Sequence, residues 1–216
     1  MTSFLSTGSS SAKTTLLLAP GAGAPMTSAW MERVSTLLAA AGVRVRRFDF
    51  SYMTARLAGV RRPPPKAEAL IGEYEAAVAA ALAETRAGGQ LLIGGKSFGG
   101  RVASLAAQTL FDAGRIAGLV CLGYPFHPPK QPEQLRTKHL KALTCPTLIL
   151  QGERDPFGVP SDVAGYGLAP AIGVHWLADG DHDLAPRKSS GATLEGNLAD
   201  AVNAIATFAD RLDQAR

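Results

Sequence analysis

Short apolar runs alternate with longer segments of helical period along most of the chain. Most of the runs are continuously apolar, as strands covered on both faces of a parallel sheet are. We expect strands over 14–19, 43–49, 90–94, 116–122, 147–151 and 173–177. This order predicts an α/β fold whose mainly parallel sheet has about six strands.

The segments between these runs carry apolar side chains every three or four residues, the spacing of one helix face. We expect these stripes to face the core rather than a ligand. Their members are Trp30, Val34, Leu37, Leu38 and Ala41; Leu70, Tyr74, Ala77, Val78, Ala81 and Leu82; Val102, Leu105, Ala106 and Thr109; and Leu198, Val202, Ile205, Phe208 and Leu212.

Two proline-rich stretches, 62–65 and 124–132, are predicted to be loops, because proline lacks the backbone N–H and clashes with a preceding helical turn. The second lies in the 123–140 segment, the only room between strands for a lid. It is too short for a cap of several helices. We therefore expect no large lid and an open, lightly covered site.

The chain has 216 residues, of which 46% are apolar and 19% charged, a composition typical of a soluble globular protein. Its polar start, 1–12, is expected to be a flexible N-terminal segment, and 13–216 a single domain. No secretory signal or membrane span is visible, so we expect a cytoplasmic protein with a monomer favoured.

The formal charge of +4 raises the question of a polyanionic partner. The densest basic groups are Arg44, Arg46 and Arg47, then Arg61 and Arg62, and no aromatic residues alternate with them as in single-strand binders. We interpret these residues as solvated surface charge and expect no nucleic-acid partner.

The two cysteines, Cys121 and Cys145, are expected at opposite ends of two parallel strands. Such ends lie roughly 17 to 20 Å apart, whereas a disulfide needs Cα atoms within ~7 Å. Both cysteines are therefore predicted to be reduced, buried and small hydrophobic residues.

The segment Gly95-Lys96-Ser97-Phe98-Gly99 places the pattern G-x-S-x-G between an apolar strand and a helical stripe. This is the context of a nucleophile elbow, a sharp turn that lifts the serine hydroxyl above the sheet. Small residues at Gly95 and Gly99 let the flanking backbone pass closely. Ser97 is thus the candidate nucleophile.

Two glycine-rich segments imitate nucleotide sites. Gly95-Lys96-Ser97 looks like the end of a phosphate-binding loop, but Gln90 stands where that motif needs a further glycine. Gly21-Ala22-Gly23 imitates a dinucleotide fingerprint, yet Met26 occupies the third glycine position, and Asp49 is then an ordinary strand-end or surface carboxylate. We expect no cofactor.

A serine hydroxyl needs a base, and the base needs a group that fixes its tautomer. His182 follows the last predicted strand, on a loop at the carboxyl edge of the sheet, where catalytic loops belong. His127 and His139 are predicted to be surface residues, although His127 could contact substrate, and His175 a packed structural residue.

Asp155 occupies the equivalent place after the preceding strand, which completes the order Ser97, Asp155, His182. Asp179, Asp181 and Asp183 are alternatives for orienting His182 or for holding a divalent metal with it. Immediate neighbours rarely fold back onto one imidazole, and no second histidine has ligand spacing. Turn formation and solvation explain these three aspartates more simply, so no metal site is predicted.

An acyl-transfer intermediate also needs two N–H donors aimed at its oxyanion. The motif assigns one to Phe98. The loop after the first predicted strand supplies the second, from Ala22, with tight packing alone as the alternative role of that loop. An apolar acyl pocket is expected from Met26, Trp30, Phe98, Tyr124, Phe126 and Phe157, although core or surface positions are equally open for most of them.

From Lys13 onward the chain resembles the α/β-hydrolase superfamily, and most of all the small lidless hydrolases of the dienelactone hydrolase-like and testis-expressed hydrolase-like groups. The matching segments are Leu18-Ala19-Pro20-Gly21-Ala22-Gly23, Gly94-Gly95-Lys96-Ser97-Phe98-Gly99-Gly100-Arg101, Gln151-Gly152-Glu153-Arg154-Asp155-Pro156-Phe157-Gly158 and Gly180-Asp181-His182.

The resemblance implies a serine hydrolase that cleaves a small-molecule carboxylic ester or thioester. Two departures stand out: Pro20 replaces a histidine that many relatives carry before the oxyanion glycine, and Ser97 replaces the cysteine nucleophile of dienelactone hydrolases proper. Because some related domains are non-catalytic parts of chromatin assemblies, the alternative is an interaction module that keeps the fold without the chemistry.

Overall fold

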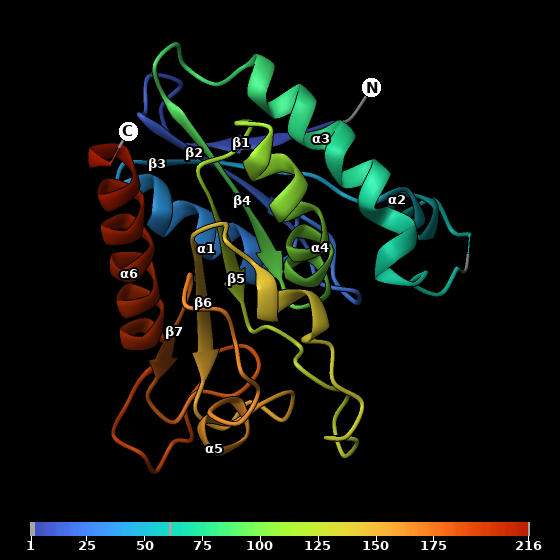
Figure 1. Cartoon of the computed structure of the whole chain (residues 1–216), viewed down its shortest axis with the longest axis vertical. Helices are drawn as coiled ribbons and strands as arrows, with labels where there is room; N and C mark the ends of the chain where they lie inside the picture. The colour runs from blue at the N-terminus through green and yellow to red at the C-terminus, as the bar shows by residue number, and fades with distance from the viewer. Residues whose placement is uncertain (1–2, 61, 216) are drawn as a thin grey trace.

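The computed structural model describes residues 3–60 and 62–215, which form a seven-stranded sheet in the order β1-β3-β2-β4-β5-β6-β7 (Figure 1). Neighbours from β3 to β7 pair in parallel, and β1 pairs antiparallel to β3. The strands are β1 (Leu5–Thr7), β2 (Thr14–Ala19), β3 (Val43–Arg47), β4 (Gln90–Lys96), β5 (Gly118–Leu122), β6 (Thr147–Gly152) and β7 (Ile172–Leu177).

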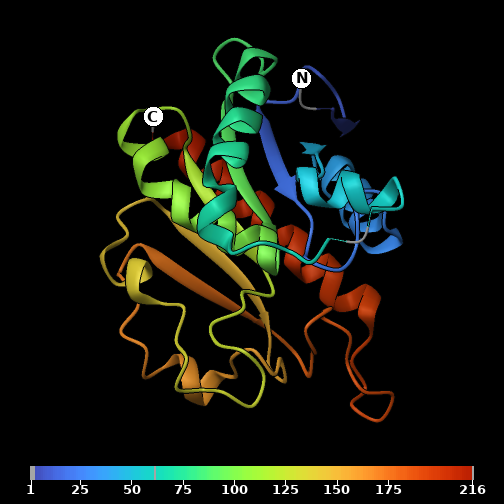
Figure 2. The ribbon, with the colours of Figure 1, turned by 90° about the vertical axis from the view of Figure 1, so that its right-hand side faces the viewer.

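Helices cover both faces of the sheet, and Figure 2 shows α6 on the opposite side of the strands from α3 and α4. The predicted stripes lie on α1, α3, α4 and α6, whereas the short α2 and α5 were not foreseen. The bounds are α1 (Ala29–Ala40), α2 (Ser51–Leu57), η1 (Ala67–Leu70), α3 (Ile71–Ala83), α4 (Phe98–Asp112), η2 (Lys138–Ala142), α5 (Pro160–Val163) and α6 (Leu194–Gln214).

The continuous apolar runs arise because successive side chains of a strand point to opposite faces. Along β2, Leu17 and Ala19 enter the core shared with α3 and α4, whereas Leu16 and Leu18 enter the core shared with α1 and α6. All four are fully buried, so the run from Leu16 to Ala19 has to be apolar on both faces of the sheet. This confirms the predicted mainly parallel sheet flanked by helices.

The expectation of a flexible segment over 1–12 is wrong at Leu5–Thr7, which form the edge strand β1 against β3. The Phe4 ring anchors this strand, since it packs edge-on against Phe48 with centroids 6.4 Å apart. Residues 1 and 2 lie outside the described residues. The apolar pair at Phe4 and Leu5 was too short to signal a strand by itself.

The interpretation of the arginine cluster as solvated surface charge is also wrong. Arg46 is 3% exposed, with its guanidinium 3.9 Å from the centre of the Phe4 ring and an ion pair to Glu84 at 3.0 Å. Arg47 is 5% exposed and donates to the Met26 carbonyl. Both arginines belong to β3, the strand that pairs with β1 at the edge of the sheet. Arg62 is exposed, as expected, and Arg61 lies outside the described residues.

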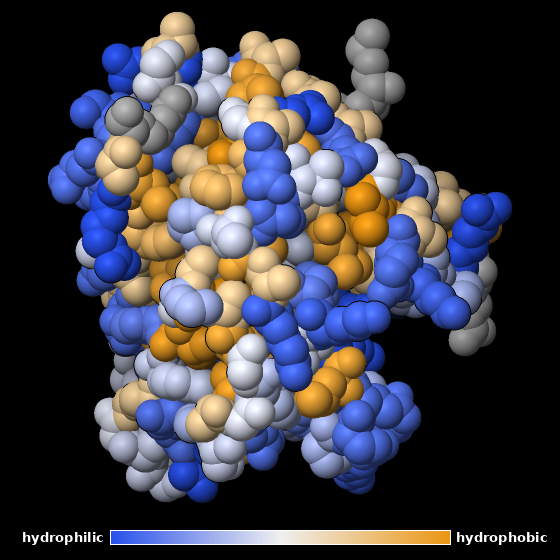
Figure 3. All heavy atoms as spheres, in the orientation of Figure 1, coloured by the Kyte–Doolittle hydropathy of each residue, from blue (hydrophilic) through white to orange (hydrophobic). Residues whose placement is uncertain are grey.

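Both cysteines are buried and free, as predicted. Burial raises the pKa of Cys145 to about 12, so this thiol stays protonated. Within 3–60 and 62–215, no helix combines the length and the apolar character needed to cross a membrane. Apolar residues reach the surface in the strip between α6 and η2 (Figure 3), in agreement with the half-buried side chains of the edge strand β7.

The proline-rich stretches 62–65 and 124–132 contain neither helix nor strand, as predicted. The connection from β5 to β6 holds only the short η2 and no large lid. β4 runs to Lys96, two residues beyond the predicted end, because Lys96 still pairs with Leu122 of β5. The carboxyl ends of β4, β6 and β7 therefore meet at one edge of the sheet, which positions the loops described next.

Candidate active site

Ser97 lies at the turn from β4 into α4 with φ 50° and ψ −114°, a conformation that side chains rarely adopt. Two glycines make this turn possible. A Cβ on Gly95 would lie 2.4 Å from the Gly99 carbonyl carbon, and a Cβ on Gly99 would lie 2.4 Å from the Pro20 oxygen. The geometry is that of the predicted nucleophile elbow.

The structure brings together the three residues predicted to act in the reaction. His182 Nε2 lies 2.8 Å from Ser97 Oγ, and His182 Nδ1 lies 2.8 Å from Asp155 Oδ2. Because a carboxylate only accepts, Nδ1 carries the proton and Nε2 is left to accept from the serine hydroxyl. This tautomer is the one that makes His182 a base toward Ser97.

Asp155 is fully buried, and three donors reach its carboxylate. Besides His182, the side chain of Gln151 donates to Oδ2 at 2.9 Å, and the Phe157 N–H donates to Oδ1 at 2.9 Å. Gln151 also bonds the N–H and the carbonyl of Tyr124. Sequence reasoning missed Gln151, although a polar residue closing a buried apolar strand was a usable signal.

Lys96 is a second residue that sequence reasoning left without a role. It is 7% exposed, and its ammonium donates to the His182 carbonyl at 2.5 Å and pairs with Asp183 at 3.1 Å. Burial lowers the pKa of Lys96, and the neighbouring Asp183 counteracts that effect.

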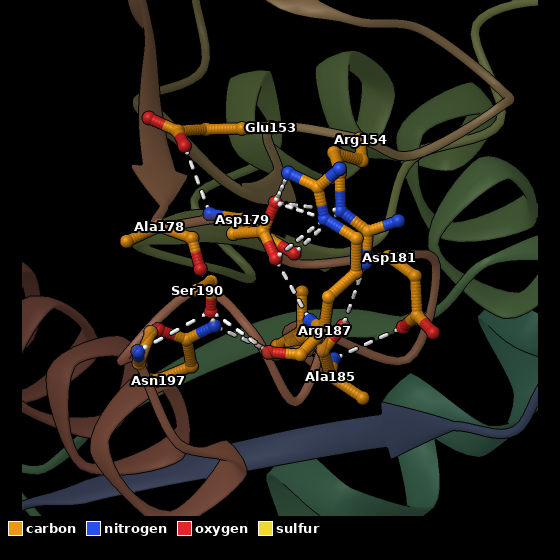
Figure 4. Close-up of polar contacts among 11 residues, drawn as sticks. Glu153, Arg154, Ala178, Asp179, Asp181, Ala185, Arg187, Ser190 and Asn197 are labelled. Carbon is orange, nitrogen blue, oxygen red and sulfur yellow. Dashed lines mark hydrogen bonds and ion pairs between the residues drawn. The ribbon is translucent and has the colours of Figure 1, made fainter.

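The loop carrying His182 is tied at both ends (Figure 4). Asp179, with φ 50°, contacts Arg187 at 2.5 Å and Arg154 at 2.9 Å. Hydrogen bonds from Arg187 lower the pKa of Asp179 to about 2. Asn197 of α6 donates to the carbonyl of Ala178 at 3.0 Å, which fastens the loop to that helix.

Asp181 shapes the turn itself, since one carboxylate oxygen accepts from the N–H groups of Asp183 and Ala185. This is the turn-forming role predicted for it. Asp179 and Asp183 do more than face solvent, because they pair with Arg187 and Lys96. Asp155, rather than any of these three, holds the His182 ring.

Both predicted oxyanion donors are free, since neither the Phe98 nor the Ala22 N–H meets an acceptor within the described residues. Phe98 begins α4, where the first N–H groups of a helix have no intrahelical partner. The loop bearing Ala22 lies beside the elbow, because a Cβ on Gly21 would lie 3.9 Å from Ser97 Cβ. The arrangement can hold negative charge next to Ser97.

A cavity of about 260 Å³ opens over Ser97. Two larger cavities, of about 410 Å³ against the start of β4 and about 1020 Å³ beside α2, lie elsewhere, and neither is lined by a histidine. The chemistry therefore selects the smaller cavity. Its lining residues are Gly21, Ala22, Gly23, Ala24, Ser28, Trp30, Met31, Lys96, Ser97, His182 and Asp183.

Of the aromatic residues expected around the acyl group, Trp30 lines this cavity, and Phe157 packs against His182 without lining it. The Phe157 ring centre is 4.4 Å from that of His182. Phe98 turns toward Phe50, with centroids 6.4 Å apart. Met26 lines a neighbouring hollow instead, where its N–H donates to Asp49 at 2.8 Å.

Tyr124 and Phe126 do not belong to the pocket, contrary to expectation. Both are fully buried, with their rings 4.9 Å apart in the core. Gly123, at φ 65°, turns the chain after β5, and Gln151 holds the Tyr124 backbone on the inner side of the loop. Tyr124 and Phe126 were expected at the pocket because they follow the end of β5. The turn at Gly123 directs their side chains into the core instead.

The other histidines are placed differently from expectation. His127 is 4% exposed rather than on the surface. His139 is partly buried against Ser104, at 2.8 Å from its hydroxyl, and burial lowers the pKa of His139 to about 4. His175, predicted to be packed, is partly exposed and lies 3.0 Å from Asp200.

Known structures with this fold are numerous. A lidless α/β serine hydrolase, XC6422 from Xanthomonas campestris, is 19% identical with a TM-score of 0.66, over 92% of this chain and 82% of that one. Dienelactone hydrolase from Anabaena variabilis is 19% identical with a TM-score of 0.68, over 98% and 90%. Est1E from Butyrivibrio proteoclasticus, solved with ferulic acid, is 13% identical with a TM-score of 0.71, over 100% and 96%.

The sequence itself matches the family model of the alpha/beta hydrolase domain over residues 12–210. That span includes the elbow, the loop with Asp155 and the loop with His182. Since the match covers most of the chain and the structural neighbours share its fold, the chain belongs to the α/β-hydrolase domain family.

Proposed function

We propose that this protein is a serine hydrolase that cleaves small carboxylic esters or thioesters through an acyl-enzyme on Ser97. The observation that carries the proposal is the hydrogen-bonded series from Ser97 through His182 to Asp155, with both links at 2.8 Å. A buried carboxylate, an oriented imidazole and a hydroxyl at the mouth of a cavity are the parts that acyl transfer needs.

In the first half of the reaction, Ser97 Oγ attacks the acyl carbonyl while His182 Nε2 takes the hydroxyl proton. The tetrahedral oxyanion accepts from the N–H groups of Phe98 and Ala22. As the bond to the leaving group breaks, His182 returns the proton to the departing alcohol or thiol. Asp155 remains ionised and stabilises the imidazolium.

In the second half, water replaces the leaving group. His182 takes a proton from the water as its oxygen attacks the acyl carbon, and the same two N–H groups hold the second oxyanion. Collapse of this intermediate breaks the bond to Ser97 Oγ, which regains its proton from His182. The products are a carboxylic acid and the free serine.

The dimensions of the cavity favour a short or flexible acyl group. Its volume of about 260 Å³ is below the ~300–1,000 Å³ of pockets for drug-sized ligands. Small residues from Gly21 to Ala24 form one wall, and the Trp30 indole supplies apolar surface. The bound ferulic acid of Est1E makes aromatic acid esters a reasonable second class to assay.

Labelling with a fluorophosphonate tests the nucleophile. The probe should modify the native protein at Ser97, and Ser97→Ala should abolish both labelling and hydrolysis of nitrophenyl acetate. Ser104→Ala is the matched control, because Ser104 also lies 2.8 Å from a histidine but is 1% exposed. That variant should be labelled like the native protein.

Absence of labelling in folded protein, or unchanged hydrolysis by Ser97→Ala, would contradict the proposal and favour the non-catalytic interaction module. A series of nitrophenyl esters from acetate to octanoate, with acetyl and butyryl thioesters, then defines the substrate. We expect kcat/KM to be highest for the short acyl groups.

A further inference from the structure

Lys96 stands between Gly95 and Ser97 in the elbow, and neither the turn nor the attack by Ser97 requires a lysine there. Its side chain is buried at the end of β4, with 9% of it exposed. Lysine is rarely buried unless its charge is paired, because removing an ammonium from water costs several kcal/mol. The groups that hold this charge therefore indicate its role.

The ammonium of Lys96 contacts the loop that carries His182. It donates to the backbone carbonyl of His182 at 2.5 Å and pairs with the Asp183 carboxylate at 3.1 Å. Trp30 holds the same loop, since its Nε1–H donates to the Asp183 carbonyl at 3.0 Å. The Lys96 Nζ lies 5.3 Å from the centre of the Trp30 ring.

Gly123 leaves the space in which this contact forms. A Cβ at that position would lie 2.9 Å from the His182 oxygen, 3.2 Å from Lys96 Nζ and 3.3 Å from His182 Cε1. Gly123 also has φ 65°, which disfavours any side chain. The lysine, the His182 backbone and the β5 turn thus form one closely packed unit.

Resting on the proposed function, we infer that Lys96 is a positioning residue that fixes the backbone of His182 and thereby aims its imidazole at Ser97. Asp155 orients the ring from one side through Nδ1, whereas Lys96 holds the main chain from which the ring extends. A displacement of ~1 Å at a reacting group can cost ~100-fold in rate.

Lys96 and Asp183 act as a neutral pair next to a base that becomes cationic during the reaction. The charged groups facing the ammonium are Asp183, Asp155 and Asp181, with Asp183 in direct contact. Removing Lys96 leaves the Asp183 carboxylate unpaired beside His182, where it can draw the imidazolium away from Ser97. Removing Asp183 leaves the ammonium unpaired, which opposes the imidazolium.

These opposite charge effects predict a reversal of sign that a purely structural lysine would not give. Lys96→Met should lower kcat at least about tenfold and change KM less than about threefold, because the aim of the base changes while methionine keeps the length of a side chain that lines the cavity. Asp183→Asn alone should lower kcat, yet in the Lys96→Met background it should raise kcat. Lys96→Arg, which keeps the charge and donors, should retain more activity than Lys96→Met.

Two measurements test the inference: kcat and KM for a nitrophenyl ester, and the downfield proton NMR signal of the His182–Asp155 hydrogen bond. The control is Lys13→Met. Lys13 precedes β2, at the amino ends of the strands and away from Ser97, and its side chain is 73% exposed. It should change neither. In Lys96→Met the downfield signal should broaden or shift while circular dichroism stays native.

A folded Lys96→Met protein with kcat within about twofold of the native value would overturn the inference, as would an unchanged downfield signal. If Lys96→Met does not fold, Asp183→Asn decides, because its side chain is 68% exposed: lowered kcat supports the inference and unchanged kcat overturns it. Failure of the proposed function is separately visible as absent fluorophosphonate labelling of native protein, and the NMR comparison still tests positioning in that case.

Discussion

The side-chain amide of Gln151 donates to Asp155 Oδ2 at 2.9 Å, on the same oxygen that accepts from His182. Gln151 also satisfies the backbone of Tyr124 in both directions. One fully buried side chain thus joins the proposed acid of the site to the loop after β5.

Gln151→Leu should therefore lower both stability and activity. Each buried polar group left without a partner costs about 1 to 3 kcal/mol. The Tyr124 N–H and the Gly158 carbonyl lose theirs together, whereas the Tyr124 carbonyl keeps the Phe126 N–H, so we expect a loss of about 2 to 4 kcal/mol in unfolding free energy. Urea unfolding measures it. The control is Gln108→Leu, which removes exposed contacts to Asp112 and Thr144 and one partly buried contact to the Cys145 N–H, and should cost about 1 kcal/mol or less. Equal losses in the two variants would refute the special role of Gln151.

Gly99→Ala should push the loop that carries Ala22 away from the turn at Ser97. Its Cβ would lie 2.4 Å from the Pro20 oxygen and 2.7 Å from the Ala19 oxygen, and overpacking of this kind costs about 1 to 3 kcal/mol. Movement of that backbone also displaces the Ala22 N–H, so kcat should fall about 100-fold, as expected for loss of one oxyanion donor.

Gly23→Ala is the matched control in the same loop, because a Cβ there meets nothing within 4 Å. Its unfolding free energy should stay within about 0.5 kcal/mol of the native value. Thermal unfolding and kcat of the two variants provide the comparison, and a stable, fully active Gly99→Ala protein would show that the close approach is not required.

The partly buried His139 should make stability fall in mild acid. Burial lowers its pKa to about 4, with Arg101 lowering it further and Glu68 opposing. Between pH ~6.5 and ~4 the unfolded chain binds a proton at His139 that the folded protein does not, so stability is highest above ~6.5 and is lost as the pH falls toward 4.

The size of this effect is on the order of 2 kcal/mol once solvent screening is considered. His139→Gln should flatten the dependence of unfolding free energy on pH in that window. Asp179, whose pKa falls from 3.8 to about 2, acts mainly below pH ~4, so the slope from pH ~6.5 to ~5 reports on His139. A native-like slope in His139→Gln would assign the acid sensitivity to other groups.

The sequence predicted the parallel strands because burial on both faces forces continuous apolar runs, as in β2. It also placed Ser97, Asp155 and His182 correctly at strand ends, since the carboxyl ends of parallel strands share one edge. Whether a residue directly follows a strand depends only on its neighbours in the sequence, so a short motif is enough to predict it.

The direction of a side chain after the strand end is not local. Tyr124 and Phe126 face inward because Gly123 turns the chain and Gln151, 27 residues from Tyr124, holds its backbone. Arg46 is buried because β1 lies against β3, a pairing that no pattern near Arg46 reveals. In each case, contacts between segments far apart in the sequence determine the position of the side chain, and the local sequence pattern does not report them.

The two hydrogen bonds around His182 join segments 85 and 27 residues apart in the chain. Contacts of such separation form late, because closing long loops costs entropy before the contacts compensate. During refolding, the helical signal should therefore return before a fluorophosphonate can react at Ser97. During folding, the reactivity of Ser97 should therefore appear last, once β7, which precedes the His182 loop, has joined the sheet.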